Sequence, residues 1–356
     1  MKKIIVDDEV FSIQDNYGGI SRLISEYLKM LEKDDDIEFI LPFNYSNNRH
    51  LNDTNYKKKK IFPNLKFYKK NNAIRFLNRF KINKALEEGN YDILLLSYLD
   101  NRIVLKNKKK LISIMHDTIH EDNSKYFKNL EYLKKSRRLI LEKSSCIISN
   151  SHETKKNIIR LYSIDEKKIH VVHPHNKAND NVEKLNLPEN FILFVGQRKG
   201  YKNFNFLIKC LSKKKINLVC VGGNEFDKNE ISTIRKNNLN DYVHYYELND
   251  SQLNYAYQNA MCHVIVSEAE GFGVTILEAQ KNDCLVLCPN LPIFYEVGKD
   301  STFYFNLNDA ENFNIQLSQI LNNNYNRNIH EKMKSNLKNY NLNDKKKNLK
   351  EILYSL

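Results

Sequence analysis

Two glutamates and two glycines between Glu270 and Glu278 carry the clearest chemical information in the sequence. The segment reads Glu-Gly-Phe-Gly-Val-Thr-Ile-Leu-Glu and follows an apolar run over residues 262–266. Gly271 and Gly273 allow a tight turn, and the helical pattern after Gly273 predicts a helix start whose unpaired N–H groups attract phosphate. A carboxylate beside a phosphate is favourable where it accepts hydrogen bonds from hydroxyl groups. The segment therefore predicts a site for a polyhydroxylated phosphate ester.

Three cations follow another apolar run, residues 191–195. After Gly196 the chain continues Gln-Arg-Lys-Gly-Tyr-Lys, which places Arg198 and Lys202 at the end of a predicted strand. Arginine offers a fork of donors and lysine a point charge, so the two could clamp a diphosphate and neutralise it as it leaves. Ordinary structure is the alternative for both segments: the cations form a surface cluster, the glycines only shape a turn, and Glu278 is a solvated helix residue.

The first half of the chain offers weaker candidates. Gly18 and Gly19 precede a helical pattern, so their N–H groups could approach a phosphate or a sugar, but a plain turn explains them equally well. His116 ends the apolar run 111–115, where residues that line a cleft are expected, although a single histidine is more often structural. No metal site is predicted, because no carboxylate or cysteine completes a ligand set with His170, His173 and His175.

Short apolar runs alternate with amphipathic helical patterns along the whole chain. The runs that read as strands are 3–6, 39–41, 93–96, 111–115, 147–149, 169–172, 191–195, 218–221, 243–245, 262–266 and 284–287. Alternating elements of this kind form parallel sheets with helices on both faces. We predict an α/β protein with two tandem Rossmann-like, doubly wound domains, residues 1–177 and 178–335, that face an interdomain cleft. Residues 336–356 are expected to form a C-terminal helix that packs back on the first domain.

Composition narrows the class of protein. With 356 residues, 41% of them apolar and 28% charged, the chain is typical of a folded globular protein. The net charge is +13, and residues 1–180 alone carry +11. No secretory signal core and no apolar run long enough to span a membrane is visible, and the six cysteines lie mostly in apolar runs without paired spacing. We expect a cytoplasmic protein.

The basic first half suggests an anionic partner. Residues 51–160 hold 26 basic and 11 acidic residues. Nucleic acid is not expected, because no recognition-helix, zinc-finger or RNP-type pattern is present. The segment 73–86 reads as a basic amphipathic helix, so an anionic membrane surface is a candidate partner and a peripheral location on the inner face of the cytoplasmic membrane follows from it. A solvated lysine-rich surface is the alternative.

These motifs together resemble glycosyltransferase family 4, retaining enzymes of the GT-B fold that transfer a sugar from a nucleotide sugar. The E-x7-E pattern from Glu270 to Glu278 is the most specific point of resemblance. Residues 194–203 are similar to the diphosphate clamp of the family, and residues 18–22 to its first-domain glycine loop. Two departures are present: Ser97 and Tyr98 stand where the family often has a histidine, and residues 173–176 replace its usual Asn-Gly.

The resemblance implies a role for each matching residue. Glu270 would hold the hydroxyls of the donor sugar, Glu278 the ribose diol, and His116 would approach the sugar from the first domain. Arg198 and Lys202 would stabilise the departing diphosphate. The implied catalytic residues are thus Glu270, His116, Arg198 and Lys202. The implied donor-binding residues are Gly18, Gly19, Gly196, Gly271, Phe272, Gly273, Val274, Thr275 and Glu278.

The resemblance also implies a reaction. A hexose, of mannose or rhamnose type, would pass from a nucleotide diphosphate sugar to a glycan or lipid-linked acceptor in the synthesis of a cell-surface polysaccharide such as lipopolysaccharide. Retention would follow from front-face attack in which the leaving phosphate helps to deprotonate the acceptor. Neither a cofactor nor a metal is expected. The alternatives are a nucleotide-sugar epimerase of the same fold and a non-catalytic basic binding protein.

Overall fold

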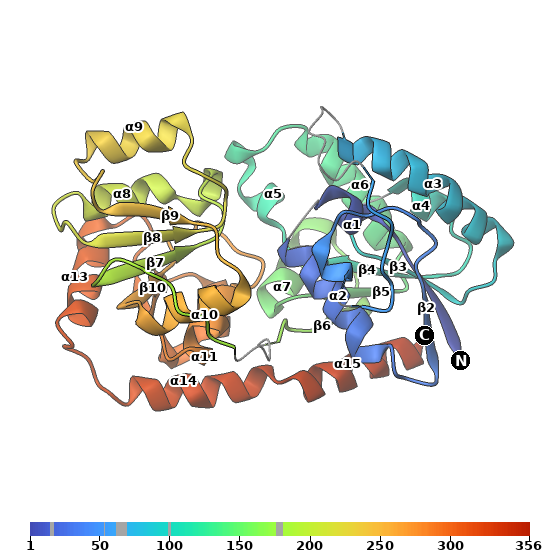
Figure 1. Ribbon diagram of the computed structural model, residues 1–356. Coiled ribbons are helices and arrows are strands. Elements are labelled where there is room, and N and C mark those ends of the chain that lie inside the picture. Colours follow the sequence, from blue (N-terminus) through green and yellow to red (C-terminus); the bar gives the residue numbers. More distant parts are fainter. Residues whose placement is uncertain (15–17, 53, 62–69, 99–100, 176–180) are drawn as a thin grey trace. The chain divides into compact units, whose positions relative to one another are not determined.

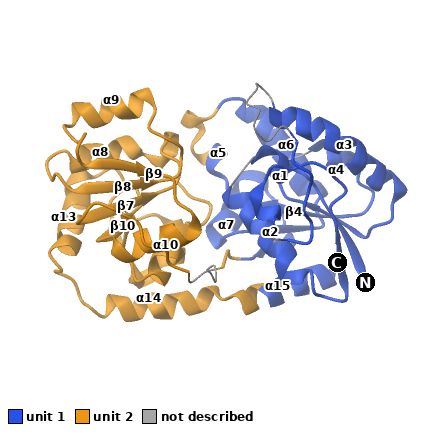
Figure 2. Cartoon of the chain, viewed as in Figure 1, with its two compact units in different colours: residues 1–121, 128–172, 346–356 blue, residues 122–127, 173–345 orange. Residues whose placement is uncertain are grey.

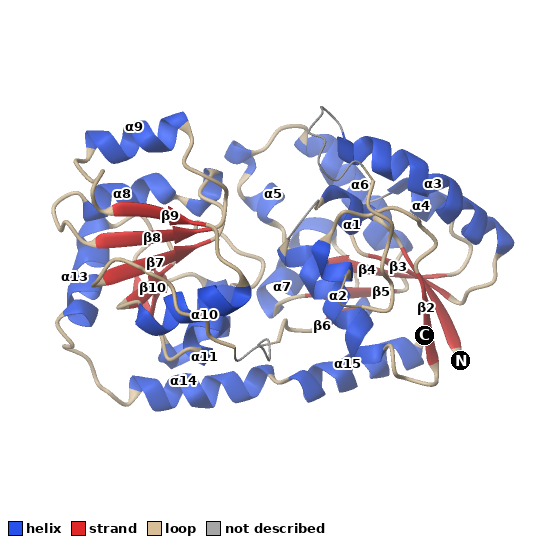
Figure 3. Ribbon diagram, viewed as in Figure 1, coloured by secondary structure: helices blue, strands red, loops and turns tan. Residues whose placement is uncertain are grey.

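The computed structural model describes residues 1–14, 18–52, 54–61, 70–98, 101–175 and 181–356, which form two α/β units (Figures 1 and 2). Unit 1 comprises residues 1–121, 128–172 and 346–356, and unit 2 comprises residues 122–127 and 173–345. The domain boundary predicted at 177/178 falls outside the described residues. Each unit is a parallel sheet with helices on both of its faces (Figure 3).

The sheet of unit 1 has six strands in the order β2-β1-β3-β4-β5-β6, all paired in parallel. Its strands are β1 (Lys2–Val6), β2 (Ile37–Ile40), β3 (Ile93–Leu96), β4 (Lys110–Met115), β5 (Cys146–Ser149) and β6 (Ile169–Val171). Every residue of β3 and β5 is buried, as expected for strands covered on both faces. The chain places β2 on one side of β1 and β3 on the other, so the strand order reverses between β1 and β3.

The helices of unit 1 cover this sheet with their apolar faces. They are α1 (Glu9–Ile13), α2 (Gly19–Leu31), α3 (Lys70–Glu88), α4 (Asn101–Lys106), α5 (Ile119–Asp122), α6 (Leu130–Lys143), α7 (His152–Tyr162) and α15 (Leu342–Ser355). The last helix belongs to unit 1 from residue 346 on, because Leu349, Ile352 and Leu353 are buried in the same apolar core as β1. An ion pair of 2.5 Å between Lys350 Nζ and Asp34 Oδ2 also holds α15 in place.

The sheet of unit 2 also has six parallel strands, in the order β12-β11-β10-β7-β8-β9. Its strands are β7 (Phe191–Val195), β8 (Asn217–Val221), β9 (Val243–Tyr246), β10 (Cys262–Val264), β11 (Val286–Pro289) and β12 (Phe303–Phe305). Its helices are α8 (Phe204–Leu211), α9 (Lys228–Lys236), α10 (Asp250–Asn259), α11 (Val274–Lys281), α12 (Pro292–Gly298), α13 (Ala310–Leu321) and α14 (Ile329–Leu337). The strand order reverses between β7 and β10.

The predicted α/β fold with two doubly wound domains is confirmed, with small differences at the ends of elements. The strand expected at 284–287 is shifted to β11, and the strand expected at 262–266 ends at Val264. The sequence did not predict β12, which has three residues of which one is buried. Among the described residues, none of the helices is both long enough and apolar enough to span a membrane.

Candidate active site

Two loops leave the sheet of unit 2 on either side of the reversal in strand order. The loop after β7 begins at Gly196, and the loop after β10 carries Glu270. In open parallel sheets, ligands bind outside the carboxyl ends of the strands at such a reversal. The topology therefore places the two segments with the clearest chemical pattern at the position where a ligand is expected.

A short ion pair joins the two loops. Lys202 Nζ lies 2.5 Å from Glu270 Oε1, and the Ser267 hydroxyl donates to the same oxygen at 2.9 Å. The Glu268 backbone N–H also donates to the Tyr201 carbonyl at 2.7 Å. The side chains of Lys202 and Glu270 are 19% and 17% exposed, so water and a ligand can reach them. The pair places one cation and one carboxylate together, which suits a ligand that carries both phosphate and hydroxyl groups.

The glycine turn ends at the start of α11, as predicted. Gly273 precedes the helix with φ 90°, in the left-handed region that favours glycine, and no side chain caps the helix start there. The first N–H groups of α11 therefore have no side-chain acceptor, and Val274 and Thr275 are half-buried beside them. Such a helix start binds anions well.

Phe272 and Glu278 flank this helix start in different ways. The Phe272 side chain is 4% exposed, and its ring packs against those of His173 and Tyr340 at centroid distances of 5.5 and 5.7 Å. The Phe272 side chain thus belongs to the apolar core of unit 2, and the predicted contact of its backbone with the donor stays a prediction. Glu278 is half-buried on α11, where Tyr257 Oη donates to its Oε2 at 3.4 Å.

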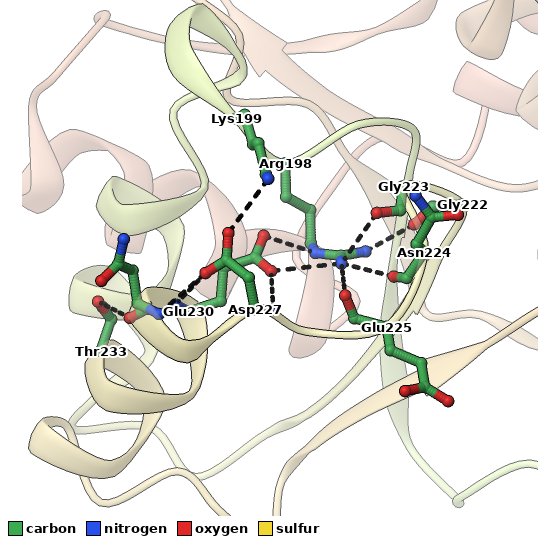
Figure 4. Close-up of polar contacts among 10 residues, drawn as sticks. Arg198, Lys199, Gly222, Gly223, Asn224, Glu225, Asp227, Glu230 and Thr233 are labelled. Carbon is green, nitrogen blue, oxygen red and sulfur yellow. Dashed lines mark hydrogen bonds and ion pairs between the residues drawn. The ribbon is translucent and has the colours of Figure 1, made fainter. Parts of the chain in front are cut away.

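Arg198, predicted to clamp a diphosphate, is bonded to other residues of unit 2 (Figure 4). Its side chain is 1% exposed, and its Nε donates to Glu230 Oε1 at 2.9 Å. The guanidinium lies over the Phe226 ring, 4.7 Å from the centroid. Its remaining N–H groups donate to backbone carbonyls of the loop after β8, namely those of Gly222, Gly223, Asn224 and Glu225. These bonds hold the guanidinium against the loop after β8, so its predicted role as a diphosphate clamp stays a prediction.

The contacts of Arg198 indicate that it shapes the loop after β8. Gly222, Gly223 and Asn224 have φ values of 85°, 77° and 64°, a left-handed run that turns the carbonyls toward the guanidinium. A Cβ at Gly223 would lie 3.2 Å from the carbonyl oxygen of Gly196, so glycine also permits a close approach of two loops. Sequence reasoning missed Glu230, and the Asp-x-x-Glu pattern at 227–230 signals only the capping box that starts α9.

In unit 1, His116 follows β4 and is buried, at 6% exposure. Its Nε2 lies 3.0 Å from the Ser97 carbonyl oxygen, and its Nδ1 lies 3.3 Å from Asn150 Nδ2. The carbonyl can only accept, so this arrangement assigns the proton to Nε2, and burial lowers the pKa of the ring. His116 is thus a neutral histidine whose two nitrogens both have protein partners, and a sugar would have to replace one of them.

Asp7 is a buried carboxyl that sequence reasoning did not single out. It ends the region of β1, is 0% exposed, and accepts a 2.6 Å hydrogen bond on Oδ1 from the Ser97 N–H. Burial raises the pKa of Asp7 to about 8. Asp7 lies at the reversal of strand order between β1 and β3. The signal in the sequence that could have indicated it is the Asp-Asp-Glu run directly after the first apolar run.

The predicted glycine loop of unit 1 is already occupied by a side chain of the protein. Gln14 Oε1 accepts from the Ser21 N–H at 2.9 Å, in the first turn of α2. A Cβ at Gly18 would lie 2.0 Å from Gln14 Oε1, so a larger residue there would displace the Gln14 amide. A Cβ at Gly19 would meet nothing within 4 Å. Gly18 therefore makes room for Gln14 in this structure.

Comparison with known proteins identifies the same class for both units. The model described as "Glycosyltransferase Family 4" matches residues 17–175, and "Glycosyl transferases group 1" matches residues 175–340. The O-antigen chain mannosyltransferase RfbU of Salmonella typhimurium is 26% identical over 245 residues, which cover 63% of this chain and 68% of that protein. An N-acetylgalactosaminyltransferase of Campylobacter jejuni that acts on a diphospho-undecaprenol glycan is 25% identical over 158 residues, 42% of each protein.

Solved structures resemble the chain over its full length. Sucrose-phosphate synthase of Thermosynechococcus elongatus has a TM-score of 0.78 at 14% identity and covers 100% of this chain, as this chain covers 99% of it. HepE of Anabaena, solved with UDP and glucose, has a TM-score of 0.76 at 15% identity, with 100% of both chains covered. At such identities the likeness concerns the fold, and it confirms the predicted GT-B fold of two Rossmann-like domains.

Proposed function

Because the chain belongs to the family 4 and group 1 glycosyltransferases, we propose that it transfers a hexose from a nucleotide diphosphate sugar to a glycan or lipid-linked acceptor, with retention of configuration. The observation that carries the proposal is the Lys202–Glu270 pair at the strand reversal of unit 2, beside the uncapped start of α11. Cation, carboxylate and free N–H groups are the partners that a sugar diphosphate needs.

Each part of this site takes one part of the donor. Lys202 and the first N–H groups of α11 bind the diphosphate, and Glu270 accepts hydrogen bonds from the sugar hydroxyls. Glu278 accepts from the ribose diol. Arg198 acts as a positioning residue, because it fixes the loop after β8 through backbone carbonyls. These assignments put the donor on unit 2 and leave the acceptor to unit 1.

The reaction needs no covalent intermediate on the protein. The bond between the anomeric carbon and the diphosphate oxygen breaks, the acceptor oxygen bonds to the same face of that carbon, and the acceptor proton passes to the leaving diphosphate. Two contacts to Glu270 Oε1 support this scheme, because a carboxylate held by Lys202 and Ser267 is a poor nucleophile. Lys202 and the start of α11 supply positive charge to the leaving group, which supports a reaction without a metal.

The names of the relatives favour transfer over the epimerase alternative. One of them is an O-antigen chain mannosyltransferase, and another transfers N-acetylgalactosamine to a diphospho-undecaprenol glycan. We therefore propose a hexose of mannose type and an acceptor in cell-surface polysaccharide synthesis. An epimerase would convert the donor sugar without an acceptor, so a time course of donor alone, followed by chromatography of the sugar, distinguishes the two activities.

A thermal-shift titration tests the donor site. The protein is titrated with UDP, GDP, dTDP and ADP and their common sugar conjugates, with and without a chelator, since a ligand that binds the folded state raises the melting temperature. We expect one base to raise it selectively, and Lys202→Ala to remove the rise. No shift at millimolar concentration would contradict the proposal. With the donor known, the anomeric proton coupling of the product tests retention.

A further inference from the structure

His173 is the first residue of unit 2, in a segment where residues 173–176 replace the Asn-Gly that is usual in the family. Its side chain is 28% exposed, and it contacts Phe272, Glu296 and Tyr340. These residues lie in three separate segments of unit 2, namely the glycine turn before α11, α12, and the short helical turn that ends at Tyr340. His173 therefore joins the start of unit 2 to the turn of the candidate donor site.

The imidazole of His173 packs on the ring of Phe272. The two ring centroids are 5.5 Å apart, and the planes make an angle of 34°. The Tyr340 ring completes the group, because its centroid lies 5.6 Å from that of His173 and 5.7 Å from that of Phe272. Rings at such distances stabilise each other beyond the apolar area that they bury. We call His173, Phe272 and Tyr340 the aromatic triad of unit 2.

Glu296 on α12 fixes the orientation of the imidazole within the aromatic triad. His173 Nε2 lies 2.9 Å from Glu296 Oε1. An ionised carboxylate can only accept, so this contact assigns a proton to Nε2. Tyr340 Oη donates to the backbone carbonyl of the same residue at 3.1 Å. Two of the three rings are thus held by one residue of α12, and the imidazole cannot turn away from Phe272 without losing its bond to Glu296.

The conformation of the glycine turn depends on the packing of Phe272. Gly271 and Gly273 flank this residue, and glycine restricts the backbone less than any other residue does. The turn therefore needs a side chain to select one of its possible conformations, and Phe272, at 4% exposure, is the buried side chain within it. The first N–H groups of α11 follow directly after Gly273, so their direction changes if the Phe272 ring moves.

We propose that His173 is a positioning residue for the donor site. Through the ring of Phe272 it holds the glycine turn in the conformation that presents the first N–H groups of α11 to the diphosphate. A turn that is ordered before the donor arrives does not have to be ordered on binding, so His173 increases the affinity for the donor without touching it. The inference rests on the proposed function and adds to it a residue outside the donor contacts.

Calorimetric titration of the full chain with UDP, GDP, dTDP and ADP tests the proposal. For the nucleotide that wild type binds, His173→Ala should raise the dissociation constant about tenfold, because it removes both the ring contact and the hydrogen bond. His173→Phe keeps a ring on Phe272, and His173→Gln keeps a donor for Glu296, so each should raise it about threefold. In steady-state kinetics the KM for the donor should rise while kcat changes less than about threefold, because His173 does not contact the reacting atoms.

His330 on α14 provides a matched control. Its Nδ1 lies 2.8 Å from Asp283 Oδ1, its side chain is 33% exposed, and its ring centroid lies 6.4 Å from that of Tyr325. His330→Ala thus removes a histidine that is also paired with a carboxylate beside an aromatic ring, but Asp283 lies beyond the other end of α11. The dissociation constant of this variant should stay within about twofold of wild type.

The outcomes separate this inference from the proposed function. If wild type binds a nucleotide and His173→Ala binds it equally well, the donor site stands and the role of His173 is wrong. Equal weakening by His330→Ala would also overturn that role, because the effect would not be specific to the glycine turn. If wild type binds none of the four nucleotides, both proposals are wrong. Should His173→Ala fail to fold, the other two variants decide, and wild-type affinity in both would contradict the inference.

Discussion

The two units differ in the residues that lie where the order of the strands reverses. In unit 1 the strand order reverses between β1 and β3, and in unit 2 between β7 and β10. The reversal in unit 2 is spanned by Lys202 and Glu270, a charged and partly exposed pair. The reversal in unit 1 is closed by Asp7, a fully buried carboxyl that accepts a hydrogen bond from the Ser97 backbone. The same position of the fold is thus charged and accessible in unit 2, but buried and hydrogen-bonded within the protein in unit 1.

The helices that begin beside the two reversals also differ in whether their first N–H groups are accessible to a ligand. The start of α11 has no side-chain cap, whereas in the first turn of α2 the Ser21 N–H already bonds to Gln14. A diphosphate needs free N–H groups and a nearby cation, and unit 2 offers both. Unit 1 offers buried neutral groups such as His116, which suit hydroxyl groups better than phosphate. The comparison therefore indicates that charge is handled in unit 2, and the following predictions test it.

The largest expected effect concerns the bridge in unit 2. Glu270→Ala and Lys202→Ala should each lower kcat at least about 100-fold, because each removes a group that contacts the donor in the transition state. Lys199→Ala is the matched control, since Lys199 is 73% exposed and pairs with Asp227 at 3.3 Å. It should change kcat less than about twofold. Steady-state kinetics with the identified donor give both values, and full activity of Lys202→Ala would place the charged site elsewhere.

The next effect concerns the enclosed ion pair of unit 2. Arg198→Met leaves Glu230 buried without its cation, so the free energy of unfolding should fall by about 3–5 kcal/mol. Arg198→Lys should not restore it, because one ammonium cannot replace the fork of donors that meets Glu230 and the carbonyls of Gly222 and Asn224. Denaturant unfolding measures the change.

A control in unit 1 separates this loss from the removal of any arginine. Arg138 is 49% exposed, lies 3.6 Å from Glu142 and donates to the carbonyls of Leu161 and Tyr162 at 3.4 and 3.3 Å. Because water reaches these partners as well, Arg138→Met should cost less than about 2 kcal/mol. Because Arg198 shapes the loop after β8, the Michaelis constant for the donor should also rise in Arg198→Lys. A stable Arg198→Met protein with unchanged kinetics would show that the enclosed pair does not shape the site.

The sequence predicts much of this architecture because apolar runs are local. The strands β3, β4 and β7 were located to within a residue, and the glycine turn before α11 lies where Gly271 and Gly273 indicated. Local periodicity could not predict which apolar residues of α3 are buried, because they lie on both sides of the helix. Only packing against the rest of unit 1 decides which side is covered. Phe76 and Ile74 are both apolar, yet they are 63% and 1% exposed.

Side-chain partners distant in sequence were beyond prediction. Arg198 and Lys202 look alike as cations after a strand, yet one is enclosed by Glu230 and the other meets Glu270. The choice depends on the left-handed run at 222–224 and on α9, which pack only in the folded chain. Asp7 shows the same limit, because a run of acidic residues after a strand predicts solvent exposure, whereas Asp7, Asp8 and Glu9 are all buried.

The buried carboxyl of unit 1 predicts a pH dependence. The pKa of Asp7 is about 8 in the fold, against 3.8 for the ordinary side chain, so the folded state binds the proton more tightly. Its contribution to stability is present below about pH 4 and is lost as the pH rises to about 8, by about 1.4 kcal/mol per pH unit. Asp7→Asn keeps the acceptor for Ser97 and has no proton to lose. Its stability relative to wild type should therefore rise across this range, and a constant difference would contradict the assignment.

The buried histidine of unit 2 predicts the opposite and smaller dependence. His263 on β10 is 1% exposed, its Nδ1 lies 3.0 Å from the Leu193 carbonyl oxygen, and burial lowers its pKa to about 4. The unfolded chain then binds the proton more tightly, so this contribution is present above about pH 6.5 and is lost as the pH falls to about 4, by about 1.4 kcal/mol per pH unit. Within that window it opposes the dependence of Asp7, so wild type alone conceals both. Denaturant unfolding of His263→Gln against wild type should show a difference that narrows as the pH falls, whereas parallel curves would mean that folding does not lower the pKa of His263.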